Sequence, residues 1–301
     1  MLIEGLMALL VVLCTLAVLV VFKPLWVMNY LAMGRHCQRI KDIPYADDDR
    51  HTMDVYVPSA YSEDKPLVVF IHGGGWDEGH KDDYVFAGRA FSEMGYLTAI
   101  PNYRLYPQVQ FPHFVEDVAL AIASLSAQLT ELGLKFRHPL PVVLVGHSAG
   151  AHSAAMLASR ADYLVQAQAQ VEIKGLVGLA GPYNLPLGDK LVVGKFDGVA
   201  LREVSAQQID SGQVDNGHDA NPINLATDSM PKALLIHGAK DITVRPHHSE
   251  SLGRRLQYLS VPCQNIVYEG TNHRHLVGAL SFFGRFLNPV YKDIERFLKS
   301  L

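Results

Sequence analysis

The chain has 301 residues, 49% of them hydrophobic and 19% charged, and a formal net charge of −4. This is the composition of an ordinary globular protein with one large domain or two small ones, and the mild acidity argues against a nucleic-acid partner, which would require a basic face. Three cysteines, Cys14, Cys37 and Cys263, are too few and too scattered for a disulfide framework or a zinc site. We expect Cys37 and Cys263 to be free thiols; the alternative is a disulfide formed in an oxidising compartment.

The first predicted element is an uncharged run of 18 residues from Gly5 to Phe22. This length can span a bilayer, so residues 1–24 are predicted to form an uncleaved, single-pass membrane anchor. A cleaved signal peptide is the alternative, although the opening "MLIE" has no basic residue and no small-x-small cleavage site follows. Basic residues after the run favour a cytoplasmic domain, but large domains cross membranes regardless of such charges, so the side of the membrane stays open.

A linker at residues 25–42 is predicted to lead into one domain at residues 43–301. The alternating segment 52–58 predicts an antiparallel or edge strand. Runs dense in Val, Ile and Leu, which are typical of strands buried on both faces, occupy residues 67–73, 96–104, 141–148, 174–182, 232–238 and 264–270. Helical patterns occupy residues 113–129, 247–259 and 282–301, the last with a break at Pro289. This alternation predicts an α/β fold with a mostly parallel sheet and helices on both faces.

The stretch "VLVGHSAGAHSAA" places a serine between two glycines where a buried strand gives way to a helix. G-x-S-x-G at such a junction is typical of a nucleophile elbow, a turn so tight that the residues flanking the serine must be small. Gly146 and Gly150 meet that requirement, so Ser148 is the predicted nucleophile.

A serine hydroxyl needs a base that is itself oriented by an acid. Asp241 follows the strand "KALLIHG" and His273 follows the strand "QNIVYEG", which gives the chain order Ser, Asp, His. His275 is the alternative base, although it more plausibly caps the following helix or lines the entrance. His237 is expected to pack in its turn, and His247 and His248 to lie on the surface. Solvated loop charge is the expected role of the remaining candidate acids, Asp189, Asp197, Asp210, Asp215 and Asp219.

Acyl transfer also requires N–H donors for the developing oxyanion. "FIHGGGW" follows a buried strand and offers the backbone amides of Gly74 and Gly75, and Ala149 offers the first amide of the elbow helix. Trp76 either lines the pocket or packs the loop against the core, and His147, beside the serine, is a second candidate pocket residue.

Together the segments "HGGGW", "NYRLYP", "FPHFVEDV", "GHSAGAH", "HGAKDITV" and "GTNH" resemble α/β-hydrolases of the carboxylesterase kind. The similar groups are hormone-sensitive-lipase-like esterases, BD-FAE-type (feruloyl and acetyl xylan) esterases, kynurenine formamidases and prenylcysteine methylesterases. The resemblance runs from about Ile43 to the C-terminus. It implies the α/β-hydrolase fold, a Ser148–Asp241–His273 triad, and a structural pairing of Arg104 with Asp117 or a similar acid. The preceding apolar run and the base motif "NHRH" depart from the usual pattern.

The expected function is hydrolysis of a small carboxylic ester by a serine nucleophile. Two alternatives stay open: an aryl formamidase or other amide hydrolase, and a catalytically silent, membrane-tethered binding domain. A polar insertion around residues 183–225 is predicted to form a small cap over the serine, because loops of that length are usually functional or disordered. No cofactor or metal is expected, since there is no phosphate-binding loop and the histidines lack metal-ligand spacing.

Overall fold

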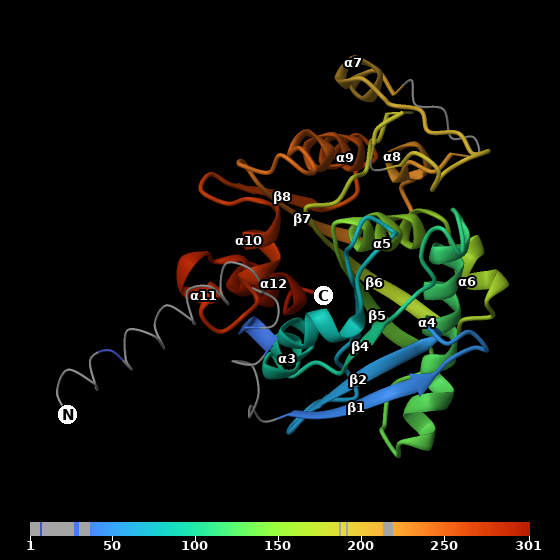
Figure 1. Cartoon of the computed structure of the whole chain (residues 1–301), viewed down its shortest axis with the longest axis vertical. Coiled ribbons are helices and arrows are strands. Elements are labelled where there is room, and N and C mark those ends of the chain that lie inside the picture. The colour runs from blue at the N-terminus through green and yellow to red at the C-terminus, as the bar shows by residue number, and fades with distance from the viewer. Residues whose placement is uncertain (1–6, 8–26, 30–36, 187, 191, 213–218) are drawn as a thin grey trace.

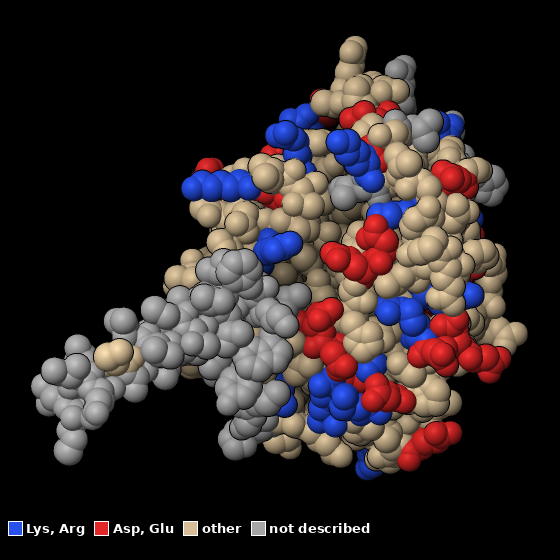
Figure 2. All heavy atoms as spheres, in the orientation of Figure 1, with Lys and Arg blue, Asp and Glu red and all other residues tan. Residues whose placement is uncertain are grey.

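The computed structural model describes residues 7, 27–29, 37–186, 188–190, 192–212 and 219–301 (Figure 1, Figure 2). The predicted anchor at residues 1–24 lies outside these residues apart from Met7, as does half of the predicted linker. Within the described part of the chain, no helix is both long and apolar enough to cross a membrane.

An eight-stranded sheet forms the centre of the molecule (Figure 1). In spatial order its strands are β1 (Cys37–Pro44), β2 (Thr52–Pro58), β4 (Thr98–Pro101), β3 (Leu67–Ile71), β5 (Leu140–His147), β6 (Val171–Leu179), β7 (Lys232–Gly238) and β8 (Cys263–Tyr268). β2 runs antiparallel to both β1 and β4, and all other neighbours are parallel. The prediction of a mostly parallel sheet with an antiparallel strand at residues 52–58 is confirmed.

The strand β1 corrects the prediction of a linker at residues 25–42. Most of its side chains are exposed or half-buried, because β1 lies at the edge of the sheet and pairs only with β2. An edge strand of this kind has no apolar run that sequence inspection could detect. β4 is also shorter than the predicted segment 96–104.

Helices cover both faces of the sheet, as predicted (Figure 1). One face carries α4 (His113–Glu131), α5 (Ala149–Ser159), α6 (Asp162–Gln166) and α9 (His247–Tyr258), and the other carries α3 (Val85–Glu93), α10 (His273–Gly278) and α12 (Val290–Leu298). The remaining helices are η1 (Lys81–Tyr84), α7 (Ala206–Asp210), α8 (Pro222–Leu225) and α11 (Gly284–Leu287). The predicted break at Pro289 is confirmed, since this residue separates α11 from α12.

Alternation along the central strands produces two hydrophobic cores. On β3, Val69 and Ile71 belong to the core beneath α4, α5 and α9, whereas Val68 and Phe70 belong to the core beneath α3, α10 and α12. Residues on both faces of the central strands are therefore apolar, which explains the continuous apolar runs in the sequence.

The two described cysteines are free thiols, as predicted. Cys37 begins β1 and Cys263 begins β8, at opposite edges of the sheet. Seven strand spacings separate these edges, about 33 Å, whereas the Cβ atoms of a disulfide lie about 4 Å apart.

Candidate active site

The predicted site residues follow four parallel strands at their carboxyl ends. The glycine-rich loop follows β3, Ser148 follows β5, Asp241 follows β7, and His273 follows β8 as the first residue of α10. Because these ends share one edge of the sheet, four segments that are distant in sequence converge there.

Ser148 occupies a strained turn between β5 and α5. Its φ of 54° and ψ of −123° are unusual for a residue other than glycine, and its backbone N–H donates to the carbonyl of Leu179 at 2.8 Å. A Cβ atom on Gly146 would lie 2.3 Å from the carbonyl oxygen of Gly150, and one on Gly150 would lie 2.1 Å from the carbonyl oxygen of Ile71. The turn therefore excludes every side chain at both flanking positions.

Asp241 and His273 form a buried acid–imidazole pair. His273 Nδ1 lies 2.7 Å from Asp241 Oδ2, and Asp241 Oδ1 accepts hydrogen bonds from the backbone N–H groups of Thr243 and Val244. Burial alone would raise the pKa of Asp241, but its hydrogen bonds to His237 and His273 outweigh burial and lower that pKa well below its usual range. The ionised carboxylate keeps a proton on His273 Nδ1, which leaves Nε2 as the basic nitrogen.

His275 has a different environment from His273. Its side chain is exposed, and its backbone N–H donates to Asn272 Oδ1 at 2.9 Å. Asn272, rather than His275, therefore caps α10. Of the two histidines, His273 is the one that reaches Asp241.

The glycine-rich loop after β3 presents unused backbone donors. Gly74 has a φ of 127° and Gly75 a φ of 57°, and a Cβ atom on Gly74 would lie 2.1 Å from the carbonyl oxygen of Glu78. Among the described residues, no protein acceptor takes a hydrogen bond from the N–H of Gly74, Gly75 or Ala149. Free N–H groups of this kind can stabilise a developing oxyanion.

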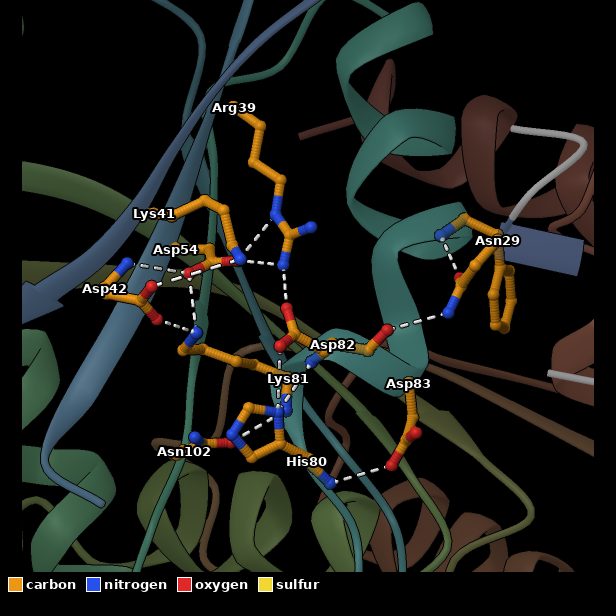
Figure 3. Close-up of polar contacts among 11 residues, drawn as sticks. Asn29, Arg39, Lys41, Asp42, Asp54, His80, Lys81, Asp82, Asp83 and Asn102 are labelled. Atoms are coloured by element: carbon orange, nitrogen blue, oxygen red, sulfur yellow. Dashed lines mark hydrogen bonds and ion pairs between the residues drawn. The ribbon is translucent and has the colours of Figure 1, made fainter. Parts of the chain in front are cut away.

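An ion network holds the far end of this loop (Figure 3). The loop continues into η1, where the buried Lys81 ammonium lies 2.9 Å from Asp54 and 2.5 Å from Asp42. Arg39 also pairs with both Asp54 and Asp82. Desolvation lowers the pKa of Lys81, but its hydrogen bonds to the two carboxylates outweigh that effect and raise the pKa. Strands β1 and β2 therefore fix the end of the loop by charge.

Tyr84 and His147 connect the glycine-rich loop to the segment that carries His273. The Tyr84 hydroxyl accepts a hydrogen bond from the Gly73 N–H at 3.2 Å and donates to His147 Nδ1 at 3.0 Å. His147 Nε2 in turn lies 3.4 Å from the carbonyl oxygen of His273, and the two imidazole rings are 5.0 Å apart. The sequence identifies His147 only as a candidate pocket residue and does not mark Tyr84, because no motif singles out a tyrosine eleven residues after Gly73.

Trp76 packs the glycine-rich loop against the core, one of the two predicted alternatives. It is 1% exposed, and its ring contacts Phe114, His152 and Phe196 at centroid distances of 4.9–5.8 Å. His147 is 5% exposed, and burial, followed by the nearby His273, lowers its pKa to about 3. Both candidate pocket residues are thus almost closed to solvent.

The insertion at residues 183–225 contributes to this packing. Its Phe196 stacks on Phe111, and its Lys195 ammonium lies 2.6 Å from Asp77 in the glycine-rich loop. Farther along, α7 packs against α9. The described part of the insertion thus contacts both the loop and a helix of the main domain.

Two polar residues were assigned the wrong environment from sequence. Asp219 is buried rather than solvated, and its carboxylate accepts hydrogen bonds from Arg202, Asn221 and Asn224. His248 is also buried, with Nδ1 accepting from the Asn184 N–H. His248 lies where the insertion meets α9, whereas the partners of Asp219 all lie within the insertion, and neither environment can be read from local sequence.

The structural pairing implied for Arg104 is confirmed. Its guanidinium makes a bidentate contact with Asp117, with Nε–Oδ2 at 2.9 Å and Nη2–Oδ1 at 2.7 Å. Asp117 is fully buried, and His51 Nε2 lies 3.2 Å from its Oδ1 atom. Within the ranges that the structure describes, no three His, Cys, Asp or Glu side chains converge in a way that could hold a metal ion.

Comparison with known proteins identifies relatives that are named as esterases and formamidases. A probable isoprenylcysteine α-carbonyl methylesterase of Oryza sativa subsp. japonica is 27% identical over 79% of this chain and 58% of its own length. The kynurenine formamidase of Danio rerio is 33% identical over 49% of this chain and 47% of its own. A truncated carbohydrate esterase from gut microbiota superimposes with a TM-score of 0.68 at 17% identity, over 89% of this chain and 97% of the other.

This chain spans just over half the length of the first curated relatives that it matches. The solved structure establishes the α/β-hydrolase fold. The family model named BD-FAE matches residues 53–256, which include Ser148 and Asp241 and cover more than half of the chain. The chain therefore belongs to the BD-FAE family of α/β-hydrolase carboxylesterases.

Proposed function

We propose that the protein is a serine hydrolase that cleaves carboxylic esters through an acyl-enzyme intermediate. The observation that carries the proposal is the 2.7 Å contact between His273 Nδ1 and the Asp241 carboxylate, at the same end of the sheet as a serine held in a nucleophile elbow after β5. A binding domain would have no need of an ionised acid that fixes the tautomer of such a histidine.

The reaction follows from the roles that these groups can take. His273 Nε2 removes the hydroxyl proton as Ser148 Oγ attacks the ester carbonyl, and the N–H groups of Gly74, Gly75 and Ala149 stabilise the oxyanion. The His273 imidazolium, stabilised by Asp241, then gives its proton to the departing alcohol. Water repeats the same sequence on the acyl-enzyme, releasing the carboxylic acid and restoring the serine.

The first prediction tests this assignment with Ser148→Ala in the full chain. We expect kcat for p-nitrophenyl esters of short acyl groups to fall by about 10⁴-fold or more, because triad members act as a unit. Labelling by a fluorophosphonate, which requires an activated serine, should also disappear. His275→Ala is the matched control and should label normally. Ester hydrolysis that survives Ser148→Ala would exclude the assignment.

The same measurement addresses a second candidate, an amide hydrolase. The formamidase similarity favours including an N-formyl arylamide, since a Ser–His–Asp site can cleave either bond and the pocket decides between them. A higher kcat/KM on the formamide than on any ester would assign the protein to that class. Loss of both activities in Ser148→Ala would leave the nucleophile assignment intact.

The proposal includes the location of the domain. We infer that residues 1–24 hold it at a membrane as a single-pass anchor, a role supported by the uncharged run from Gly5 to Phe22. The vesicle experiment on the exposed side chains of α11 tests this anchor as well.

A further inference from the structure

Three large apolar side chains are exposed side by side on and next to α11. Phe283 is 55% exposed, Phe286 77% and Leu287 88%. The rings of Phe283 and Phe286 both pack against Phe282, at 5.1 and 5.7 Å. We call the surface formed by Phe283, Phe286 and Leu287 the α11 face. Clustered apolar exposure of this kind is typical of an interaction surface.

The one charged residue within the segment 283–287, Arg285, does not contribute a charge to the α11 face. Arg285, the charged residue between these side chains, pairs with Glu93 at 2.5 Å and lies 3.8 Å from the centre of the Tyr291 ring. Its guanidinium is thereby directed to α3 and α12, away from the exposed rings.

The chain that follows the apolar run joins the domain beside this surface. Asn29 accepts a hydrogen bond from the Phe86 N–H and donates to the carbonyl of Asp82 (Figure 3). Met28 Sδ lies 3.4 Å from the position that a Cβ on Gly278 would occupy, and Gly284, the first residue of α11, also packs directly on Gly278. Residues 27–29 and α11 lie at the same end of the molecule (Figure 1).

The length of the intervening chain limits how far the run can lie from the α11 face. Met28 comes six residues after Phe22, the last residue of the run, and six residue steps reach at most about 21 Å when fully extended. If the run is in a bilayer, the α11 face is within one short connection of that bilayer.

We propose that the α11 face lies on the surface of the lipid bilayer, with Phe283, Phe286 and Leu287 in its interfacial layer. This inference rests on the proposed anchor but not on the proposed catalysis. Lipid suits the surface better than a second copy of the chain does. Three such side chains offer at most about 600 Å², whereas a stable protein interface buries about 800 Å² on each partner.

The proposed orientation brings the candidate site close to lipid. His273 opens α10, and Gly278, five residues on, is where α11 packs. Five residues of helix span about 7.5 Å, so α11 packs on α10 at a point about 7.5 Å along the helix from the candidate base. The substrate class that this favours is an ester dissolved in, or partitioned into, the membrane.

A tryptophan placed on the α11 face tests the contact directly. The full chain carrying Phe286→Trp is reconstituted in phosphatidylcholine vesicles, with and without bromine atoms on the acyl chains, which quench indole fluorescence at short range. The emission added by Trp at 286, relative to the parent protein, should be blue-shifted and mostly quenched by the brominated lipid. Val165→Trp, at an exposed apolar position on α6, is the matched control and should add unquenched emission.

Any of three other outcomes would contradict the proposed contact between the α11 face and lipid. A chain that does not float with the vesicles lacks the anchor and the lipid contact alike. Blue-shifted but unquenched emission shows that protein, including a second copy, covers the face. Red-shifted, unquenched emission shows that the face is open to water.

The substrate class has its own readout in the same vesicles. Phe286→Ser with Leu287→Ser should reduce hydrolysis of a long-chain p-nitrophenyl ester several-fold and leave a short-chain, water-soluble ester unchanged, whereas Val165→Ser should change neither. An equal effect on both esters would contradict the membrane-borne substrate. A parent protein without activity would contradict the proposed function alone, because the quenching result does not depend on catalysis.

Discussion

At the scale of single residues, the candidate site includes two side chains that take no part in the proposed reaction, the Tyr84 phenol and the His147 imidazole. The His147 Nε2 atom faces a carbonyl, which requires its proton there and leaves Nδ1 to accept from Tyr84. Burial holds this imidazole neutral. The donor and acceptor in each of these hydrogen bonds are therefore fixed, from the Gly73 N–H to the His273 carbonyl. Together the bonds connect the oxyanion loop to the segment that carries the base.

The second prediction concerns this connection. Tyr84→Phe leaves the Gly73 N–H and His147 Nδ1 without their partner, so we expect a loss of about 1–3 kcal/mol in the free energy of unfolding. If Tyr84 also positions the site, kcat should fall about tenfold with KM little changed. Tyr45→Phe is the control, since the Tyr45 hydroxyl donates to the carbonyl of Asn102, which is not among the site residues. Equal kcat in the two variants would reduce Tyr84 to a structural role.

At the scale of elements, the insertion supports the oxyanion loop in addition to the ion network. Phe196 meets Trp76 edge-on at 4.9 Å and stacks on Phe111 at 5.2 Å. Trp76 adjoins Gly75, one of the proposed oxyanion donors, and has a φ of 65°. The side chain of Phe196 therefore helps to hold a strained residue in place.

The third prediction follows from this contact. Phe196→Ala should cost about 3–5 kcal/mol of stability, the usual range for a buried phenylalanine. It should also lower kcat, because the loop can relax into the space left behind. Phe136→Ala, near the amino end of β5 and so at the opposite edge of the sheet, is the control for kcat. A Phe196→Ala variant with unchanged kcat would show that the insertion does not set the loop geometry.

Elements marked by local chemistry were predictable from sequence, and elements set by distant contacts were not. The elbow, the glycine-rich loop and the buried strands have local signatures of small residues and apolar runs. The polar edge strand β1, the burial of Asp219 and the Tyr84–His147 connection have none, because each depends on how the chain packs in three dimensions. Predicting the pairing of Asp241 with His273 requires two kinds of information. The apolar runs locate the ends of β7 and β8, and the parallel arrangement of these strands brings the two ends together.

At the scale of the whole molecule, the fold buries four neutral histidines. Burial lowers the pKa of His72, His147 and His248 to about 3 and that of His152 to about 4. His152 illustrates the cause: it packs among Trp76, Phe111 and Phe196, and within the described residues its Nδ1 has no hydrogen-bond partner. A proton there would bury an unpaired charge.

These histidines make stability depend on pH in a defined direction. In the unfolded chain each takes up a proton near pH 6.5, whereas in the folded chain each stays neutral until about pH 3–4. Folding therefore loses stability as the pH falls through this window. At pH 5 each costs about 2 kcal/mol relative to pH 7, against a total of 5–15 kcal/mol for a typical domain. Asp241, whose pKa is lowered, loses its own stabilising effect only at more acidic pH, below the ordinary value of a carboxyl.

The fourth prediction is therefore a steep loss of stability between pH 7 and pH 5, measured as the free energy of unfolding in guanidinium by circular dichroism. His152→Gln removes one of the four titrations and retains a donor for the carbonyl of Ala220, which His152 Nε2 now contacts at 2.7 Å. This substitution should reduce the loss of unfolding free energy between pH 7 and pH 5 by about a quarter. His113→Gln, at an exposed histidine of α4, is the control for replacing a surface imidazole by the same amide. Equal stability at pH 7 and pH 5 in the parent protein would mean that these imidazoles are protonated in the folded chain, and the neutral form of His147 on which the Tyr84 connection depends would then be wrong as well.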